Sequence, residues 1–290
     1  MPSTLLMNIA WTSDHTPQAL LFDDGQLTPR TIDAAPLTLS FDTAQRYCTG
    51  WHDLETGERH SCPDQAAIDA KYEQCPACQR RTGFNPAFYH AKSVSEQQDK
   101  RNHQPHYLYL AYFAPDHIKV GISFAGRGQS RLLEQGARAA LVLETFPTAL
   151  IARQYEADIA RLDGIYEHLS ARKKRALWAS SYSTEAALQQ LDAALKRVSS
   201  TLGVTFADTL FIDCDSAYFF TAPPPLDDVV SRNTDAMISG DVVGCIGTEL
   251  IAKNDSRLLS LNLKKFIGYP VELSSTIEPI SLPPQQASLF

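Results

Sequence analysis

Four of the six cysteines in this chain lie close together, and their spacing constrains its fold more than any other feature. Thirteen, twelve and two residues separate Cys48, Cys62, Cys75 and Cys78. Two cysteines separated by two residues can bind one ion, and four such ligands complete the tetrahedral shell of a structural zinc site. Large apolar side chains are scarce around them, so metal binding would supply stability that this segment lacks. We therefore predict a zinc-binding segment at residues 47–85.

Other uses of these cysteines remain open at this stage. A thioredoxin-like C-x-x-C pair would lie between a strand and a helix of a βαβ unit, whereas here the neighbouring residues are polar. Unligated thiols are a further possibility, and either His52 or His60 could replace one cysteine as a ligand. Cys214 and Cys245 lie in apolar, strand-like runs, so we expect both to be small buried residues.

The N-terminus has neither a basic start nor a small-residue cleavage site, which argues against a secretory signal. No apolar run reaches the roughly 18 residues that a membrane helix needs. We therefore expect a cytoplasmic protein without membrane contact, in a compartment where disulfides are rare.

Hydrophobic periodicity divides the chain into β-rich and mixed regions, which predicts an α+β fold. A polar linker with partial helix is expected at residues 86–105. The predicted regions are an N-terminal β-region at residues 1–46, the zinc segment at 47–85, a central α/β domain at 106–203, and a small C-terminal β-domain with a tail at 204–290.

The central domain has the clearest pattern, a three-stranded sheet with helices. The expected elements are a hairpin at residues 106–123, a helix within 126–136, a strand at 140–146, a helix capped by Thr148 and running to about His168, and a helix from Ser183 to Gly203.

Charge is distributed unevenly along the chain. Residues 71–175 carry 16 Lys and Arg against 10 Asp and Glu, a net charge of +6, whereas the remainder carries −13. A basic middle between acidic flanks is typical of a region that meets an anion such as a phosphate backbone. A mildly basic surface without a ligand is the alternative, and the run at residues 172–175 could be a solvated face or could grip a backbone.

Short motifs in the basic region resemble those of GIY-YIG nucleases in a divergent form. The motifs are Tyr107-Leu108-Tyr109, Ile118-Lys119-Val120-Gly121, Ser130-Arg131 with Gln135-Gly136-Ala137, and Tyr155-Glu156. More closely, the chain is similar to an uncharacterised prokaryotic family of unknown function. That family combines an N-terminal cysteine-rich segment with a core reading YLA…KVG…R…QGA.

The resemblance implies both a fold and a chemistry. The implied fold is a hairpin, a helix, a third strand and a long helix. In the implied chemistry, Tyr109 helps to activate a water molecule and Arg131 stabilises the charge that grows on phosphorus. Glu156 would hold one Mg²⁺ or Mn²⁺ ion, because such ions bind through one or two carboxylates together with substrate oxygens.

The chain departs from the usual nuclease pattern at two positions. Lys119 stands where a tyrosine is usual, and Gln135 lies in the stretch after the arginine that often holds a histidine or tyrosine. A buried lysine could serve as a base or bind phosphate as a point charge. We also expect substrate contacts from Arg127, Gln135 and Arg153, and close approach of phosphate to the backbone at Gly121.

Two functions follow as hypotheses. The first is a metal-dependent endonuclease acting on DNA or RNA, with its four key side chains meeting in one basic site. The second is a catalytically degenerate, zinc-stabilised nucleic-acid-binding protein. A zinc-stabilised scaffold that binds only proteins is a third interpretation. The first predicts divalent-dependent cleavage that is lost in Arg131→Ala and in Glu156→Ala, and the second predicts salt-sensitive binding without cleavage.

Overall fold

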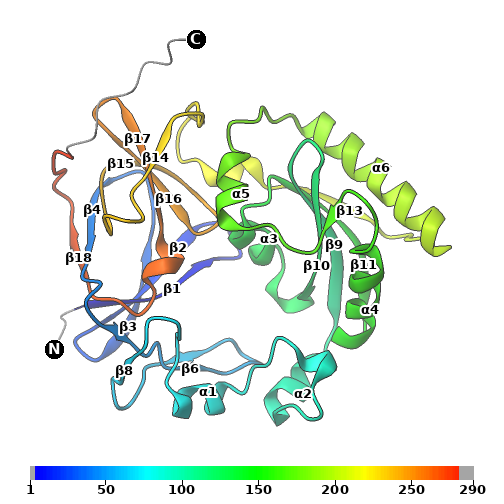
Figure 1. Cartoon of the computed structure of the whole chain (residues 1–290), viewed down its shortest axis with the longest axis horizontal. Coiled ribbons are helices and arrows are strands. Elements are labelled where there is room, and N and C mark those ends of the chain that lie inside the picture. The colour runs from blue at the N-terminus through cyan, green and yellow to red at the C-terminus, as the bar shows by residue number, and fades with distance from the viewer. Residues whose placement is uncertain (1–3, 281–290) are drawn as a thin grey trace.

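The computed structural model describes residues 4–280 and has a mixed α+β fold, as the sequence predicted. Three parts surround a common centre in Figure 1: strands from both ends of the chain, the cysteine-containing segment, and a helix-covered sheet. Within the described residues, strands form several sheets and helices are few. In the same residues, no helix has the length and apolar character needed to cross a membrane.

The start of the chain forms a three-stranded antiparallel sheet. Its strands are β1 (Thr4–Trp11), β2 (Pro17–Asp23) and β3 (Gln26–Thr31). The second hairpin turns at Asp24 and Gly25, whose φ angles of 45° and 83° fit a type I′ turn. This sheet packs its apolar face against a second, larger sheet.

The larger sheet has six strands in the order β14-β17-β16-β15-β4-β18. The strands are β14 (Val229–Ser231), β17 (Arg257–Asn262), β16 (Glu249–Asn254), β15 (Met237–Ile246), β4 (Pro36–Phe41) and β18 (Val271–Ser274). Strand β4 lies between β15 and β18 and pairs with both. The predicted N-terminal and C-terminal β-regions therefore share one sheet. We call β1–β4 and β14–β18 together the β-part.

The cysteine segment, residues 46–82, has little regular structure. Its two short ladders pair β5 (Arg46–Tyr47) with β8 (Ala67–Ile68) and β6 (Trp51–His52) with β7 (Arg59–His60). Helix α1 (Pro76–Thr82) follows, and then η1 (Phe88–His90) and α2 (Glu96–Asn102) lead to the central part.

The central part is built on a five-stranded sheet in the order β12-β10-β9-β11-β13. Its strands are β12 (Ile165–Tyr166), β10 (His117–Phe124), β9 (His106–Ala114), β11 (Ala139–Phe146) and β13 (Leu210–Asp213). The sequence predicted three strands. Strand β12 is too short to give a period-2 pattern. Strand β13 lies in the region 204–290 that the sequence assigned to the C-terminal β-domain, but it pairs with β11 instead.

Five helical elements complete the central part. They are η2 (Ala125–Arg127), α3 (Ser130–Gln135), α4 (Ala149–Ile159), α5 (Ala171–Ala176) and α6 (Thr184–Leu202). Thr148 caps α4 as predicted, but α4 ends well before His168, because the chain turns at Gly164 into β12. Helix α6 begins after Ser183 and ends at Gly203, as predicted.

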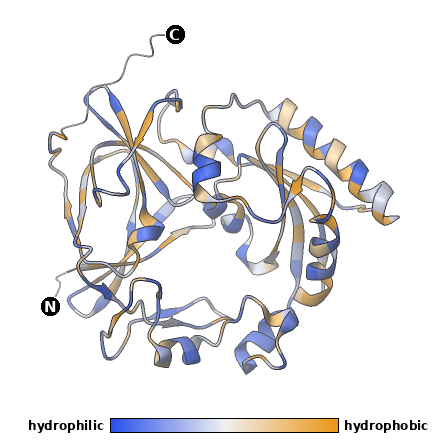
Figure 2. Cartoon of the chain, viewed as in Figure 1, coloured by the Kyte–Doolittle hydropathy of each residue, from blue (hydrophilic) through white to orange (hydrophobic). Residues whose placement is uncertain are grey.

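Helices cover both faces of the central sheet, which leaves β9 buried along its whole length. Helices α4 and α6 pack on one face, and Figure 2 shows α6 alternating between hydrophobic and hydrophilic residues as an amphipathic helix should. Helix α3 packs on the other face through Leu132 and Leu133.

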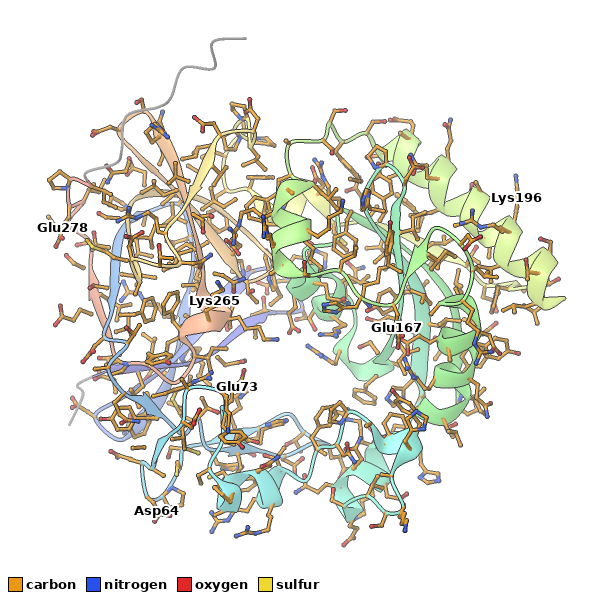
Figure 3. The ribbon with its side chains drawn as sticks, viewed as in Figure 1. Asp64, Glu73, Glu167, Lys196, Lys265 and Glu278 are labelled. Atoms are coloured by element: carbon orange, nitrogen blue, oxygen red, sulfur yellow. The ribbon has the colours of Figure 1, made fainter. Side chains whose placement is uncertain are left out.

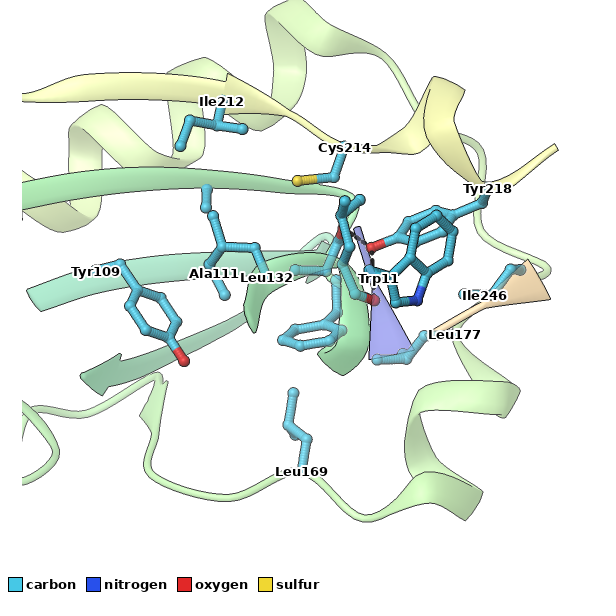
Figure 4. Close-up of a cluster of buried hydrophobic side chains, with 14 of the residues drawn as sticks. Trp11, Tyr109, Ala111, Leu132, Leu169, Leu177, Ile212, Cys214, Tyr218 and Ile246 are labelled. Atoms are coloured by element: carbon cyan, nitrogen blue, oxygen red, sulfur yellow. Dashed lines mark hydrogen bonds between the residues drawn. The ribbon is translucent and has the colours of Figure 1, made fainter. Parts of the chain in front are cut away.

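The central part and the β-part meet beside the end of α3. Tyr218, in η3 (Asp215–Tyr218), donates a hydrogen bond of 2.7 Å to the Ala137 carbonyl oxygen. Trp11 packs edge-on against Tyr218 and donates a 2.8 Å bond to the Gly247 carbonyl oxygen (Figure 4). These buried contacts fix the orientation of the β-part relative to α3.

Candidate functional site

The four predicted cysteine ligands meet at one point. Cys48, Cys62, Cys75 and Cys78 are all buried, and their sulfur atoms lie within 4.8 Å of one another. This is the close approach that a tetrahedral thiolate site requires. The cluster could therefore hold a metal ion such as zinc.

Backbone N–H groups support the sulfur atoms. The Cys75 N–H donates to Cys48 Sγ at 3.1 Å, and the Gly50 N–H donates to the same sulfur at 3.4 Å. Cys75 also caps α1, accepting from the Cys78 N–H at 3.5 Å, with Pro76 at the first helical position. Burial raises the pKa of Cys48 to about 11, while hydrogen bonds from the Cys78 N–H and neighbouring thiols outweigh burial and lower the pKa of Cys75.

The two histidines lie outside this group. All four members of the cluster are cysteines, and His60 instead stacks on Trp51 with ring centroids 3.9 Å apart. Neither His52 nor His60 therefore replaces a cysteine in this cluster. Cys214 and Cys245 are buried and form no disulfide, which confirms the prediction that both are small buried residues.

Tyr109 lies at the centre of the second candidate site. Its side chain is 1 % exposed, and its hydroxyl points away from the apolar cluster in Figure 4. Gln135, at the end of α3, donates a hydrogen bond to this hydroxyl. Burial raises the pKa of Tyr109, while the charge of Arg131 and hydrogen bonds from Gln135 and Arg131 act in the opposite direction. The hydroxyl therefore stays protonated near neutral pH.

Lys119 lies on the neighbouring strand β10, on the same face of the sheet as Tyr109. It pairs with Ala111, whose small side chain leaves room, and its Nζ donates to the Val120 carbonyl oxygen at 2.9 Å. Burial lowers the pKa of Lys119 to about 8, partly offset by the negative charge of Glu156.

Glu156 lies on α4, which packs on the opposite face of the sheet from Tyr109. It is 7 % exposed, and its charge acts on both Tyr109 and Lys119. Arg153 donates from Nη1 to Glu156 Oε2 at 2.6 Å and from Nη2 to Glu167 Oε1 at 2.7 Å. Arg153, predicted to contact substrate, is thus a carboxylate partner and also stacks on Tyr89.

Gly121 faces Tyr109 directly across the hairpin. A Cβ atom added at Gly121 would lie 2.6 Å from Tyr109 Cζ, so only glycine leaves space for the ring. The sequence suggested that this glycine lets phosphate approach the backbone. The structure gives a different reason, since Gly121 is buried beneath the tyrosine.

We expect Gly121→Ala to lower the free energy of unfolding by about 1–3 kcal/mol, because the added methyl overpacks the site. Denaturant titration measures the loss. The control is the same change in a Tyr109→Ala background, where the methyl finds space and should cost much less. Equal losses in both backgrounds would rule out the steric explanation.

Arg127 lies near this site but has a partner. Its Nη2 forms a 2.5 Å ion pair with Glu134, and its side chain is exposed. It therefore offers a weaker case for substrate binding than Arg131, because a salt bridge already satisfies its charge.

One further cation comes from a segment that the sequence left ambiguous. Lys174, on α5, donates from Nζ to the Gln135 carbonyl oxygen at 2.7 Å. Of the run at residues 172–175, Arg172 and Lys173 are exposed, as a solvated face would be, whereas Lys174 and Arg175 are half-buried. A six-residue helix carries too little periodicity to identify the inward residues.

The framework arginines have carboxylate partners, but the cations around Tyr109 do not. Arg138 pairs with Asp215 at 2.6 Å and Arg175 with Glu249 at 2.8 Å. Among the ion pairs of residues 4–280, none involves Lys119, Arg131 or Lys174.

A family model described as "Protein of unknown function (DUF2797)" matches residues 71–271, well over half of the chain. The chain belongs to the DUF2797 family. Searches of curated proteins and of solved structures returned no match. The DUF2797 match includes every residue of the site around Tyr109, but it begins after Cys48 and Cys62. Half of the cysteine cluster therefore lies outside the matched DUF2797 region.

Proposed function

We propose that this DUF2797 protein is a divalent-metal-dependent endonuclease with a GIY-YIG-type site. The observation that carries the proposal is the placement near the buried Tyr109 of three cations that form no ion pair within residues 4–280. Lys119 lies on the same sheet face, Arg131 hydrogen-bonds to the tyrosine, and Lys174 is linked to it through Gln135. Half-buried cations are unfavourable unless an anion neutralises them. A phosphodiester is the anion that the resemblance to GIY-YIG nucleases implies.

The order of elements supports the proposal. Strands β9 and β10 form a hairpin, and α3, β11 and α4 follow in the order that the resemblance implies. Tyr109 comes from the hairpin, Arg131 from α3 and Glu156 from α4, and the charges of the latter two both act on Tyr109.

The proposed chemistry adds a water oxygen to phosphorus and breaks the bond to the leaving oxygen. Lys119 is better suited than Tyr109 to accept the water proton, because its pKa of about 8 gives a neutral fraction at mildly alkaline pH. The protonated Tyr109 hydroxyl would orient the water, and the planar guanidinium of Arg131 would stabilise charge on the phosphoryl oxygens.

Glu156 fits the role of a divalent-ion ligand. Its Oε2 accepts from Arg153, while its Oε1 has no hydrogen-bond partner within residues 4–280. One hard oxygen is thus available, and Mg²⁺ needs few protein ligands when substrate and water supply the rest. When bound, such an ion would act as a Lewis acid on the phosphoryl oxygens.

A second function, nucleic-acid binding without cleavage, is favoured by a different observation. The ion pair with Arg153 already occupies Glu156 Oε2, and Tyr109 is sealed beneath its neighbours. Either feature would hinder catalysis and would leave the unpaired cations able to bind a backbone.

The test is an assay of the full chain with single-stranded and double-stranded DNA and RNA, in Mg²⁺, Mn²⁺ or EDTA. We expect cleavage that requires the metal and is lost in Glu156→Gln. We also expect affinity to fall with salt, with a slope of about −0.9 for each phosphate neutralised on duplex DNA.

The outcomes separate the two functions. Salt-sensitive binding without cleavage in any metal supports the degenerate protein and contradicts the nuclease. No binding, or binding that salt does not weaken, contradicts both.

A further inference from the structure

Lys174 is connected to Tyr109 through one residue. The Lys174 ammonium donates to the carbonyl oxygen of Gln135, and the Gln135 side chain donates to the Tyr109 hydroxyl. The ammonium also lies 4.7 Å from the centroid of the Phe113 ring, on the same strand and face as Tyr109. Helix α5 therefore delivers a cation to the proposed site from outside the motif segments.

The neighbouring residue on α5 shows that this placement is specific. Arg175 forms its 2.8 Å ion pair with Glu249, a buried residue of the β-part. That pair anchors the helix, so the orientation of Lys174 is set by the contact between the central part and the β-part. Lys174 itself uses one of its three donors on Gln135, and none of its contacts within residues 4–280 is to a carboxylate.

Four structural elements bring positive charge to this place. Lys119 on β10, Arg131 on α3 and Lys264 on η4 (Leu263–Phe266) each act on Lys174. Figure 3 labels Lys265, another lysine of η4, beside the ribbon of the β-part, whereas Lys196 lies at the far edge of the central part. The β-part therefore contributes to the electrostatics of a site whose motifs all lie in the central part.

We propose that Lys174 binds an oxygen of a tetrahedral oxyanion held beside Tyr109, between the central part and the β-part. If the proposed function is correct, this anion is a phosphate group of the nucleic-acid backbone. Only the identity of the natural ligand rests on the proposed function. The proposal extends the anion site beyond the residues that the nuclease resemblance names.

Protonation should be coupled to anion binding. Burial, together with the charges of Lys119, Arg131 and Lys264, lowers the pKa of Lys174 to about 7. A bound anion favours the protonated form and so raises this pKa. Binding is then strongest below pH 7, weakens as the pH rises above 7, and takes up a proton in that range.

Sulfate is a suitable probe, because it has the tetrahedral oxygens of phosphate but does not titrate between pH 6 and 9. Calorimetry in two buffers of different ionisation enthalpy measures both affinity and proton uptake. We expect the wild-type affinity to fall about tenfold or more from pH 6 to pH 9, since one pKa unit corresponds to a tenfold change.

Variants distinguish the contribution of Lys174 to sulfate binding from the contributions of its neighbours. Lys174→Met should lose about tenfold in affinity at pH 6 and most of the proton uptake near pH 7. Lys174→Arg should keep the affinity but lose that uptake, since arginine does not titrate here. The matched control Lys173→Met changes an exposed lysine of the same helix and should behave as wild type. Uptake that persists in Lys174→Arg near pH 8 belongs to Lys119.

The proposal is overturned if Lys174→Met, confirmed folded by circular dichroism, binds sulfate as wild type does, or if Lys173→Met loses as much. Its failure differs from failure of the proposed function. Nucleic acid that is cut equally by wild type and Lys174→Met, with unchanged sulfate binding, defeats this inference alone. Sulfate binding as predicted without any cleavage defeats the nuclease alone.

Discussion

Replacing Cys78 by serine is expected to unfold the cysteine segment and to abolish zinc binding. The segment's apolar cluster consists of the four cysteines, with Trp51, Ala66 and Ile68 packed against them. So small a cluster contributes little without metal, whereas a structural zinc ion contributes on the order of 10 kcal/mol to folding. Metal analysis should find one zinc per wild-type chain and none in the variant, and hydrogen exchange should show lost protection at residues 47–82.

The matched control is Cys245→Ala, which removes a buried thiol outside the cluster. It should lower the stability of the apolar core and leave the zinc content unchanged. Zinc retained at full occupancy in Cys78→Ser, with normal exchange protection, would contradict the four-cysteine site.

The unfolding should stay local, because the segment is attached to the β-part by bonds that do not involve sulfur. Arg46 Nε donates to the Ile267 carbonyl oxygen at 2.8 Å, and the Tyr47 N–H donates to the Gly268 carbonyl oxygen at 2.7 Å. Exchange protection in β9 and β16 should therefore survive treatment with a chelator.

Arg131→Ala is expected to reduce the rate of cleavage by about 10²–10³-fold, the usual loss when one donor to a developing oxyanion is removed. Arg131 is half-buried and hydrogen-bonds to Tyr109, but it forms none of the ion pairs found in residues 4–280, so no carboxylate competes with phosphoryl oxygens for its guanidinium. Arg131→Lys should restore part of the rate, because it keeps the charge but loses the planar fork of donors. Single-turnover cleavage measures both.

The control for this prediction is Arg161→Ala, just beyond α4, whose exposed side chain pairs with Asp158. It should leave cleavage unchanged. If Arg131→Ala weakens nucleic-acid binding and wild type shows no cleavage, the degenerate protein is favoured. Cleavage that persists at the wild-type rate in Arg131→Ala would refute the assignment of the active site.

The features predictable from sequence are those with local causes. The C-x₂-C pair indicated a metal site because its spacing alone brings two sulfurs together, and the structure confirms that Cys48 and Cys62, which were also predicted as ligands, join them. The caps at Thr148 and Ser183 were predictable because a capping side chain bonds to its own helix. Neither inference needs knowledge of distant residues.

The features that the sequence did not predict depend on contacts between residues that are far apart in the sequence. Strand β4 has the same local pattern whichever sheet it joins, so its place between β15 and β18 could not be inferred. Gly121 is explained by the ring of Tyr109 across the hairpin. Lys174 resembles its basic neighbours until the Arg175–Glu249 pair orients α5. Part of the candidate site was therefore predictable from the motifs, and the remainder depends on tertiary packing.

The position of β4 also has a consequence for biosynthesis. This strand leaves the ribosome well before one of its two partners, β18, because most of the described chain lies between them. At about 5–20 residues per second, about 10–50 s pass between the synthesis of β4 and that of β18. During that time β4 lacks at least one of its two neighbouring strands. An apolar strand that stays unpaired for that long is expected to bind a chaperone. Premature termination before residue 271 would leave one of its edges permanently open to aggregation.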